Sequence, residues 1–126
     1  MFTSNFATAG ANPNAVCISR GAPPFYKGPK YMPLAPSWEL LKSAKTLGPE
    51  EWDSLYEQSV LGRLSAEKVA ADLGENAVML CWEKAGEWCH RVLVARWLER
   101  ECGILVPEYE KPAAPVTVPL FSGTEG

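Results

Sequence analysis

Short runs of apolar residues bounded by turn-forming residues alternate with stretches of helical periodicity along this chain. Continuous apolar runs of four to eight residues are typical of strands covered on both faces, as in parallel sheets. Such runs predict strands at Ala15–Ser19, Asn76–Cys81 and Ile104–Val106, and a further short strand within Met1–Thr8.

The segments between these runs carry helix signals. Ser37 and Ser65 can cap helix starts, Pro49 suits a first helical position, and glycines follow the predicted helix ends. The predicted helices are Trp38–Thr46, Pro49–Val60, Ser65–Leu73 and Trp88–Cys102. We therefore expect a small Rossmann-like α/β domain, a three-layer fold with a short, mainly parallel sheet flanked by helices. It should occupy residues 1–109, with a right-handed crossover unit at Val78–Val106 and a Pro-rich tail at residues 110–126.

Composition narrows the class of protein. The 126 residues, 47% of them hydrophobic, suffice for one domain with its own core. A net charge of −3 does not indicate the basic surface typical of nucleic-acid-binding proteins. The chain has neither an apolar run of the roughly 18 residues that a membrane span needs nor a secretory signal, so we expect a cytoplasmic protein. Its four cysteines are then expected to be reduced, and its five tryptophans to pack in the core.

Chemically active side chains flank one predicted strand end. The strand closes at Cys81, Glu83 follows, and Cys89–Arg91 begins the next helix. In an α/β fold, the carboxyl end of a strand and the amino end of the following helix lie at the same edge of the sheet, where ligands bind. Two thiols, a carboxylate, the only histidine and an arginine are thus expected in one small volume.

Three of these residues are candidate catalytic groups. Cys89 would lie at a helix start, which lowers the pKa of a thiol and suits a nucleophile, although cysteine also packs well as a core residue. His90 could serve as a general base or merely hydrogen-bond the strand-end backbone. Glu83 could orient that base or bind a ribose hydroxyl, or simply be solvated.

A metal site is the alternative for the same cluster. Cys81, Cys89 and His90 could ligate zinc, but their spacing does not match the familiar zinc motifs, so no metal is expected. A fourth ligand would have to come from Glu83, Cys17 or Cys102.

An anion pocket is predicted beside the thiols. Ser19 and Arg20 end an earlier strand, so they should meet Cys81 and Arg91 at the same edge and bind a phosphate or similar anion. Each arginine could instead pair with an acidic residue. In the Pro-rich loop Gly21–Pro36, aromatic and basic side chains could form a lid that stacks a base, or could pin a surface loop. These loop residues are Tyr26, Lys27, Lys30 and Tyr31.

At these motifs the chain resembles the bacterial, archaeal and phage family called domain-of-unknown-function 488. The resemblance spans about Phe2 to Val106 and is strongest in the Leu-Cys-x-Glu and Cys-His-Arg motifs. It implies a Rossmann-like domain and supplies no reaction. The matching segments are Thr3–Ser4, Ile18–Arg20, Leu34–Ser37, Leu80–Glu83 and Cys89–Arg91.

Two functions of different class follow. The first is a thiol-containing anion pocket that binds or processes a nucleotide or a nucleic-acid-derived ligand. The second is a non-catalytic protein-interaction module, which could be phage-encoded, that uses the Pro-rich loop and tail. An apolar patch in the tail, Val116–Phe121, could dock on the domain or on a second copy and help form a homodimer. The sequence identifies no cofactor.

Overall fold

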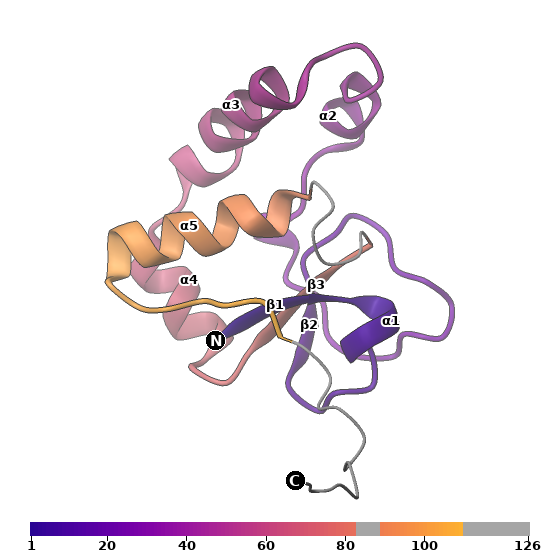
Figure 1. Cartoon of the computed structure of the whole chain (residues 1–126), viewed down its shortest axis with the longest axis vertical. Helices are drawn as coiled ribbons and strands as arrows, with labels where there is room; N and C mark the ends of the chain where they lie inside the picture. Colours follow the sequence, from indigo (N-terminus) through magenta and orange to yellow (C-terminus); the bar gives the residue numbers. More distant parts are fainter. Residues whose placement is uncertain (83–88, 110–126) are drawn as a thin grey trace, which may run out of the picture.

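The sheet is the centre of the fold. A computed structural model of the chain describes residues 1–82 and 89–109. Within these residues, β1 (Phe2–Asn5), β2 (Ala15–Cys17) and β3 (Val78–Cys81) form a parallel sheet in the order β1-β3-β2 (Figure 1). Both pairings are parallel, with Phe2 and Ala15 opposite Val78 and with Asn5 opposite Cys81 at the other end of β3. The predicted small α/β fold with a parallel sheet is confirmed.

Helices cover the sheet. Figure 1 shows α5 and α4 beside the strands, α1 at the opposite side of the view, and α2 and α3 extending away from the sheet. Local signals explain most helix ends: Ser37 Oγ accepts a bond from the Leu40 amide at 3.0 Å, and Gly103 ends α5 with a left-handed φ of 68°. The helix bounds are Phe6–Ala9 for α1, Trp38–Ser43 for α2, Pro49–Ser59 for α3, Ala66–Leu73 for α4 and His90–Cys102 for α5, with 3₁₀ turns at Met32–Leu34 and Leu61–Arg63.

Two hydrophobic clusters sandwich the sheet. Met79 of β3 belongs to the larger cluster, which it shares with α3, α4 and α5. Its neighbours Val78 and Leu80 point the other way, into a smaller cluster with Phe6 and Tyr26. This alternation is the period of two expected for a strand, and it explains why β3 is apolar throughout.

The short strand predicted within Met1–Thr8 is confirmed as β1, and it ends at Asn5 because the Asn5 side chain accepts a bond from the Thr8 amide and caps α1. Ile104–Val106 is not a strand, so the predicted last strand is wrong. There the Val106 amide donates to the Glu99 side chain at 2.9 Å, and the backbone of the described chain pairs with β1 at one parallel bridge, between Thr3 and Glu108. Without that strand, the predicted crossover unit at Val78–Val106 is not complete.

Some predictions concern residues outside the described part of the chain. These are the roles of Glu83 and Trp88, and the tail at residues 110–126 with its apolar patch. Among the described residues, no helix is both long enough and apolar enough to cross a membrane.

Candidate functional site

The structure brings Cys81, Cys89 and His90 together at the carboxyl end of β3. Cys81 is the last residue of β3, Cys89 is the extended residue that precedes α5, and His90 begins that helix. Their ligand-type atoms all lie within 4.8 Å of one another, and all three residues are buried. The meeting of strand end and helix start predicted from the sequence is therefore present.

The sulfur atoms of Cys81 and Cys89 are joined as a disulfide. This pairing differs from the reduced thiols that the sequence favours, and it arises because the fold places the strand end directly against the residue that caps α5. Cys17 and Cys102 are free thiols. The Cys17 Sγ contacts the Ser19 carbonyl at 3.5 Å, and Cys102 lies at the far end of α5, so neither belongs to the cluster.

His90 is oriented by the backbone that follows β2. Its Nε2 lies 2.8 Å from the Ile18 carbonyl oxygen, which can only accept, so Nε2 carries the hydrogen. The other ring nitrogen, Nδ1, faces the Cys89 Sγ at 3.7 Å. Burial, reinforced by the nearby charge of Arg91, lowers the pKa of His90 to about 4 despite the bond to Ile18. The imidazole is therefore neutral at pH 7, and its unprotonated Nδ1 faces the Cys89 sulfur.

Arg91 lies under this cluster and is only 1% exposed. Its Nη1 donates to the Cys81 Sγ at 2.9 Å, while Nε and Nη2 donate to the two carboxylate oxygens of Glu108 at 3.1 and 3.0 Å. Glu108 also accepts from the Thr3 hydroxyl at 2.8 Å. The structure thus shows the acid pairing that the sequence left open for Arg91, and its role in binding an anion stays a prediction.

Arg20 and Ser19 follow β2 as predicted. The Arg20 Nε and Nη2 donate to the carbonyls of Pro36 and Ala35 at 3.1 and 3.4 Å, which anchors a half-buried guanidinium group. Ser19 is 5% exposed, and its hydroxyl has no hydrogen-bond partner among the described residues. A buried hydroxyl left in this state costs about 1–3 kcal/mol, which is a reason to look for a ligand there.

These two residues line a hollow of about 260 Å³ between two exposed tryptophans. Trp38 is 60% exposed and Trp82 is 53% exposed, whereas Trp52 and Trp97 are buried as expected. Trp82 directly follows Cys81, and its Nε1 donates to the Gly21 carbonyl at 2.9 Å. We call this site the tryptophan hollow; its lining residues are Ser19, Arg20, Gly21, Pro36, Trp38, Leu41 and Trp82.

A second, larger hollow adjoins it through Arg20. It encloses about 500 Å³ and brings a second cation, Arg63, to the same surface as Arg20, with Glu39 at its wall. Arg63 is not among the site residues predicted from the sequence, because a lone arginine after a helix carries no local signal of a pocket.

The aromatic residues of the Pro-rich loop are held by the protein itself. Tyr26 is 7% exposed, packs edge-on against Phe6 and donates its hydroxyl to the Pro29 carbonyl at 2.6 Å. The Tyr31 hydroxyl donates to Asp72 at 2.7 Å. These contacts pin the loop, in agreement with the alternative interpretation of its aromatic residues, and leave Lys27 exposed at its surface.

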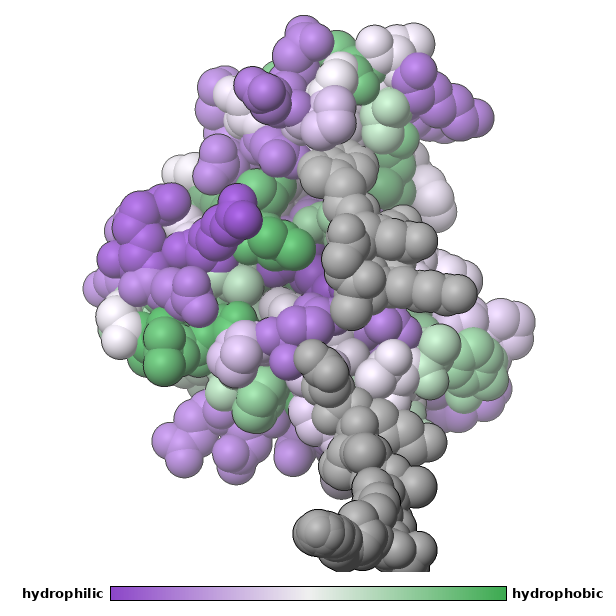
Figure 2. All heavy atoms as spheres, in the orientation of Figure 1, coloured by the Kyte–Doolittle hydropathy of each residue, from purple (hydrophilic) through white to green (hydrophobic). Residues whose placement is uncertain are grey.

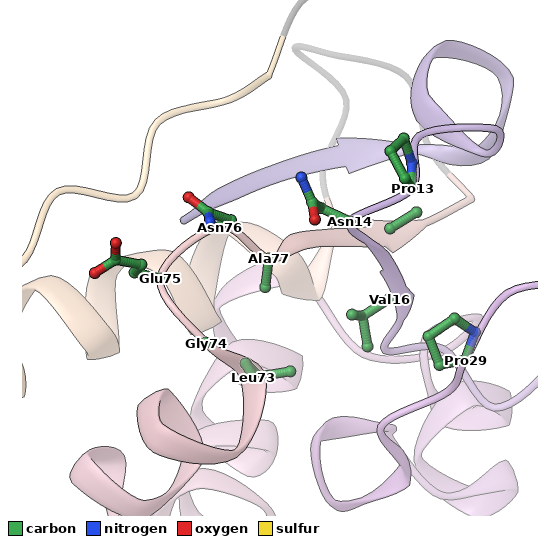
Figure 3. A pocket seen from close by; sticks show the side chains of 10 residues that line it. Pro13, Asn14, Val16, Pro29, Leu73, Gly74, Glu75, Asn76 and Ala77 are labelled. Carbon is green, nitrogen blue, oxygen red and sulfur yellow. The ribbon is translucent and has the colours of Figure 1, made fainter.

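A further pocket lies at the opposite end of the strands (Figure 3). It encloses about 350 Å³ and is bordered by the residues that precede β2 and β3. Glu75 is its one charged lining side chain within the described part of the chain, and Figure 3 shows two asparagines, Asn14 and Asn76, among small apolar side chains around the rest. Nothing in it resembles the convergence of thiols, histidine and arginines at the carboxyl ends.

Comparisons with known proteins add no family to this geometry. No family model matches the chain, and neither the curated proteins nor the solved structures compared with it show a significant match. The resemblance to domain-of-unknown-function 488 therefore stays a prediction, and the function has to be argued from the site.

Proposed function

We propose that the protein binds a nucleotide-type ligand, a planar ring that carries an anionic group, at the carboxyl edge of the sheet. The observation that carries this proposal is the tryptophan hollow, where two exposed indoles flank a buried hydroxyl without a partner among the described residues. Stacking of a base on an aromatic side chain contributes about 1–3 kcal/mol, and it needs an exposed ring face such as these indoles offer.

The hollow is partly organised before a ligand arrives. The bond from Trp82 to the Gly21 carbonyl fixes one wall, and Ser37 caps the helix that begins with Trp38 and so positions the other. A ligand group that bonds the Ser19 hydroxyl would remove the cost of its burial without ordering new side chains. Low ordering cost favours affinity in a site of modest size.

Arg20 supplies the anion contact. Two of its nitrogens are fixed on backbone carbonyls, so the guanidinium group is held at the boundary between the tryptophan hollow and the hollow that contains Arg63. A ligand whose ring occupies the first hollow can direct a phosphate group into the second. The proposed anion contacts are therefore Arg20 and Arg63, since Arg91 already pairs with Glu108.

The test is a titration with nucleosides, nucleoside mono- and diphosphates and inorganic phosphate, followed by tryptophan fluorescence and thermal shift. A ligand at 100 times its Kd should stabilise the fold by about 2.7 kcal/mol. Trp38→Ala should weaken binding about 5- to 150-fold, the equivalent of 1–3 kcal/mol of stacking. Phe25→Ala is the matched control, because Phe25 is an aromatic residue of similar exposure, 62%, outside the hollow.

A protein-interaction module is the competing function. The exposed Phe25 of the Pro-rich loop favours it. On the face seen in Figure 2, however, hydrophobic side chains form separate small groups among hydrophilic ones. If no nucleotide and no phosphate shifted the melting temperature, the ligand proposal would be refuted, and the protein-interaction module would become the leading function.

A further inference from the structure

We infer that, in their reduced state, Cys81, Cys89 and His90 form a binding site for a zinc ion. This inference is independent of the proposed ligand, because it uses a different set of side chains. The three residues come from two elements that meet at the carboxyl edge of the sheet, and their donor atoms lie within 4.8 Å of one another. Two thiolates and an imidazole form a donor set that suits Zn²⁺, with bonds of about 2.3 Å to sulfur and 2.0–2.1 Å to nitrogen.

The histidine is already oriented as a ligand. Metal-binding histidines almost always donate their other ring N–H to a carbonyl or carboxylate, which fixes the ring and its tautomer. His90 does this through Nε2 and the Ile18 carbonyl, and it leaves the Nδ1 lone pair facing Cys89. The bond to Ile18 therefore fixes the ring in the orientation that a metal ligand at Nδ1 requires.

The backbone spacing of the two cysteines also fits an ion between them. Their Cα atoms are 7.3 Å apart, outside the range of about 4.4–6.8 Å usual for disulfides. Two thiolates on one tetrahedral zinc ion stand roughly 3.8 Å apart, from the Zn–S bond length and the tetrahedral angle. A Cα–Cα separation of 7.3 Å leaves room for two sulfur atoms at this distance on one ion.

Charge balance supports the same assignment. Two thiolates and a neutral imidazole neutralise Zn²⁺, and binding releases the two thiol protons to solvent. Arg91 donates to the Cys81 sulfur at 2.9 Å, and a bidentate bond to Glu108 holds it in place. This is the outer layer of hydrogen bonds that tunes metal sites.

The described residues supply three ligands. Cys17 and Cys102, two of the residues considered for the fourth position, lie outside the cluster. Three protein ligands with one open position, filled by water or substrate, are the pattern of catalytic zinc sites. The third residue considered, Glu83, lies outside the described part of the chain.

The experiment uses the full chain, reduced with a phosphine, freed of metal by a chelator and titrated with Co²⁺ and then Zn²⁺. We expect one equivalent of Co²⁺ to give a thiolate-to-metal charge-transfer band and tetrahedral d–d bands, and one equivalent of Zn²⁺ to abolish both. Cys81→Ser, Cys89→Ser and His90→Gln should each lose the bound equivalent. Cys102→Ser, a cysteine of the same chain outside the cluster, should keep it.

A measurement on the unaltered protein guards against variants that fail to fold. Zn²⁺ should protect Cys81 and Cys89 from alkylation, with sites read by mass spectrometry, and should leave Cys102 as reactive as before. Uptake without a charge-transfer band, or protection that includes Cys102 equally, would overturn the inference. So would a reduced protein that takes up no zinc, and the cluster would then be a dithiol pair. Nucleotide binding is measured separately, so failure of either proposal leaves the other standing.

Discussion

The ion pair between Arg91 and Glu108 should be a main contributor to the stability of the site, and Glu108→Ala tests this. The substitution removes two bonds to a guanidinium group that is 1% exposed and one bond from the Thr3 hydroxyl. Breaking a buried ion pair costs about 3–5 kcal/mol. Because the Glu108 side chain is 27% exposed, we expect Glu108→Ala to lower the free energy of unfolding by about 3 kcal/mol, the lower end of this range.

Urea unfolding measures this cost. With a slope of about 2 kcal/mol per molar urea, a loss of 3 kcal/mol lowers the midpoint by about 1.5 M. Glu101→Ala is the matched control, because Glu101 pairs with Arg100 at 3.2 Å on the surface, where both side chains are about half exposed. Such exposed pairs contribute about 0–1 kcal/mol. A midpoint for Glu108→Ala no lower than that for Glu101→Ala would refute the reasoning.

Three smaller predictions concern local structure. Ser37→Ala removes the cap of α2 and should lower the free energy of unfolding in urea by about 1 kcal/mol. The control is Ser59→Ala at an exposed serine, which should change this free energy by less than about 0.5 kcal/mol. Gly103→Ala places a Cβ in open space, so only the left-handed φ of this residue opposes the substitution. We expect the melting temperature to fall by the equivalent of about 1 kcal/mol, and an unchanged melting temperature would contradict this reasoning. Tyr56→Phe deprives the buried Leu34 carbonyl of its 2.6 Å bond and should lower the free energy of unfolding in urea by about 1–3 kcal/mol, so an unchanged urea midpoint would contradict it.

The sequence predicted the parts of the site that depend on local pattern. Apolar runs located β2 and β3, and cap residues located most helices within a few residues of their observed ends. Because parallel strands present their carboxyl ends at one edge, the pattern also placed Ser19, Cys81 and Cys89 in the same region. That inference needed only the direction of the strands.

The parts that the sequence did not predict depend on long-range packing. Glu108 reaches Arg91 only because the chain returns alongside β1, and no local pattern of an isolated Pro-Glu-Tyr segment signals that return. The sequence also does not predict that Trp38 and Trp82 are exposed, because a tryptophan in an apolar stretch gives the same pattern whether it packs in the core or lines a surface hollow. The strand expected at Ile104–Val106 failed for a related reason, because the Glu99 side chain takes the Val106 amide that a sheet partner would have used.

The proposed zinc cluster and the tryptophan hollow are built from adjacent residues of the chain. The Ile18 carbonyl accepts a bond from His90, and the next residue, Ser19, lines the hollow. In the same way, Cys81 belongs to the cluster and the next residue, Trp82, lines the hollow. If both zinc and a nucleotide bind, and water takes the fourth zinc position, metal-assisted chemistry on the ligand becomes a function to test. If zinc binds alone, the ion holds the strand end to α5 as a structural centre. If the nucleotide binds alone, the protein is a binding module, and the paired cysteines then hold the start of α5 against the end of β3.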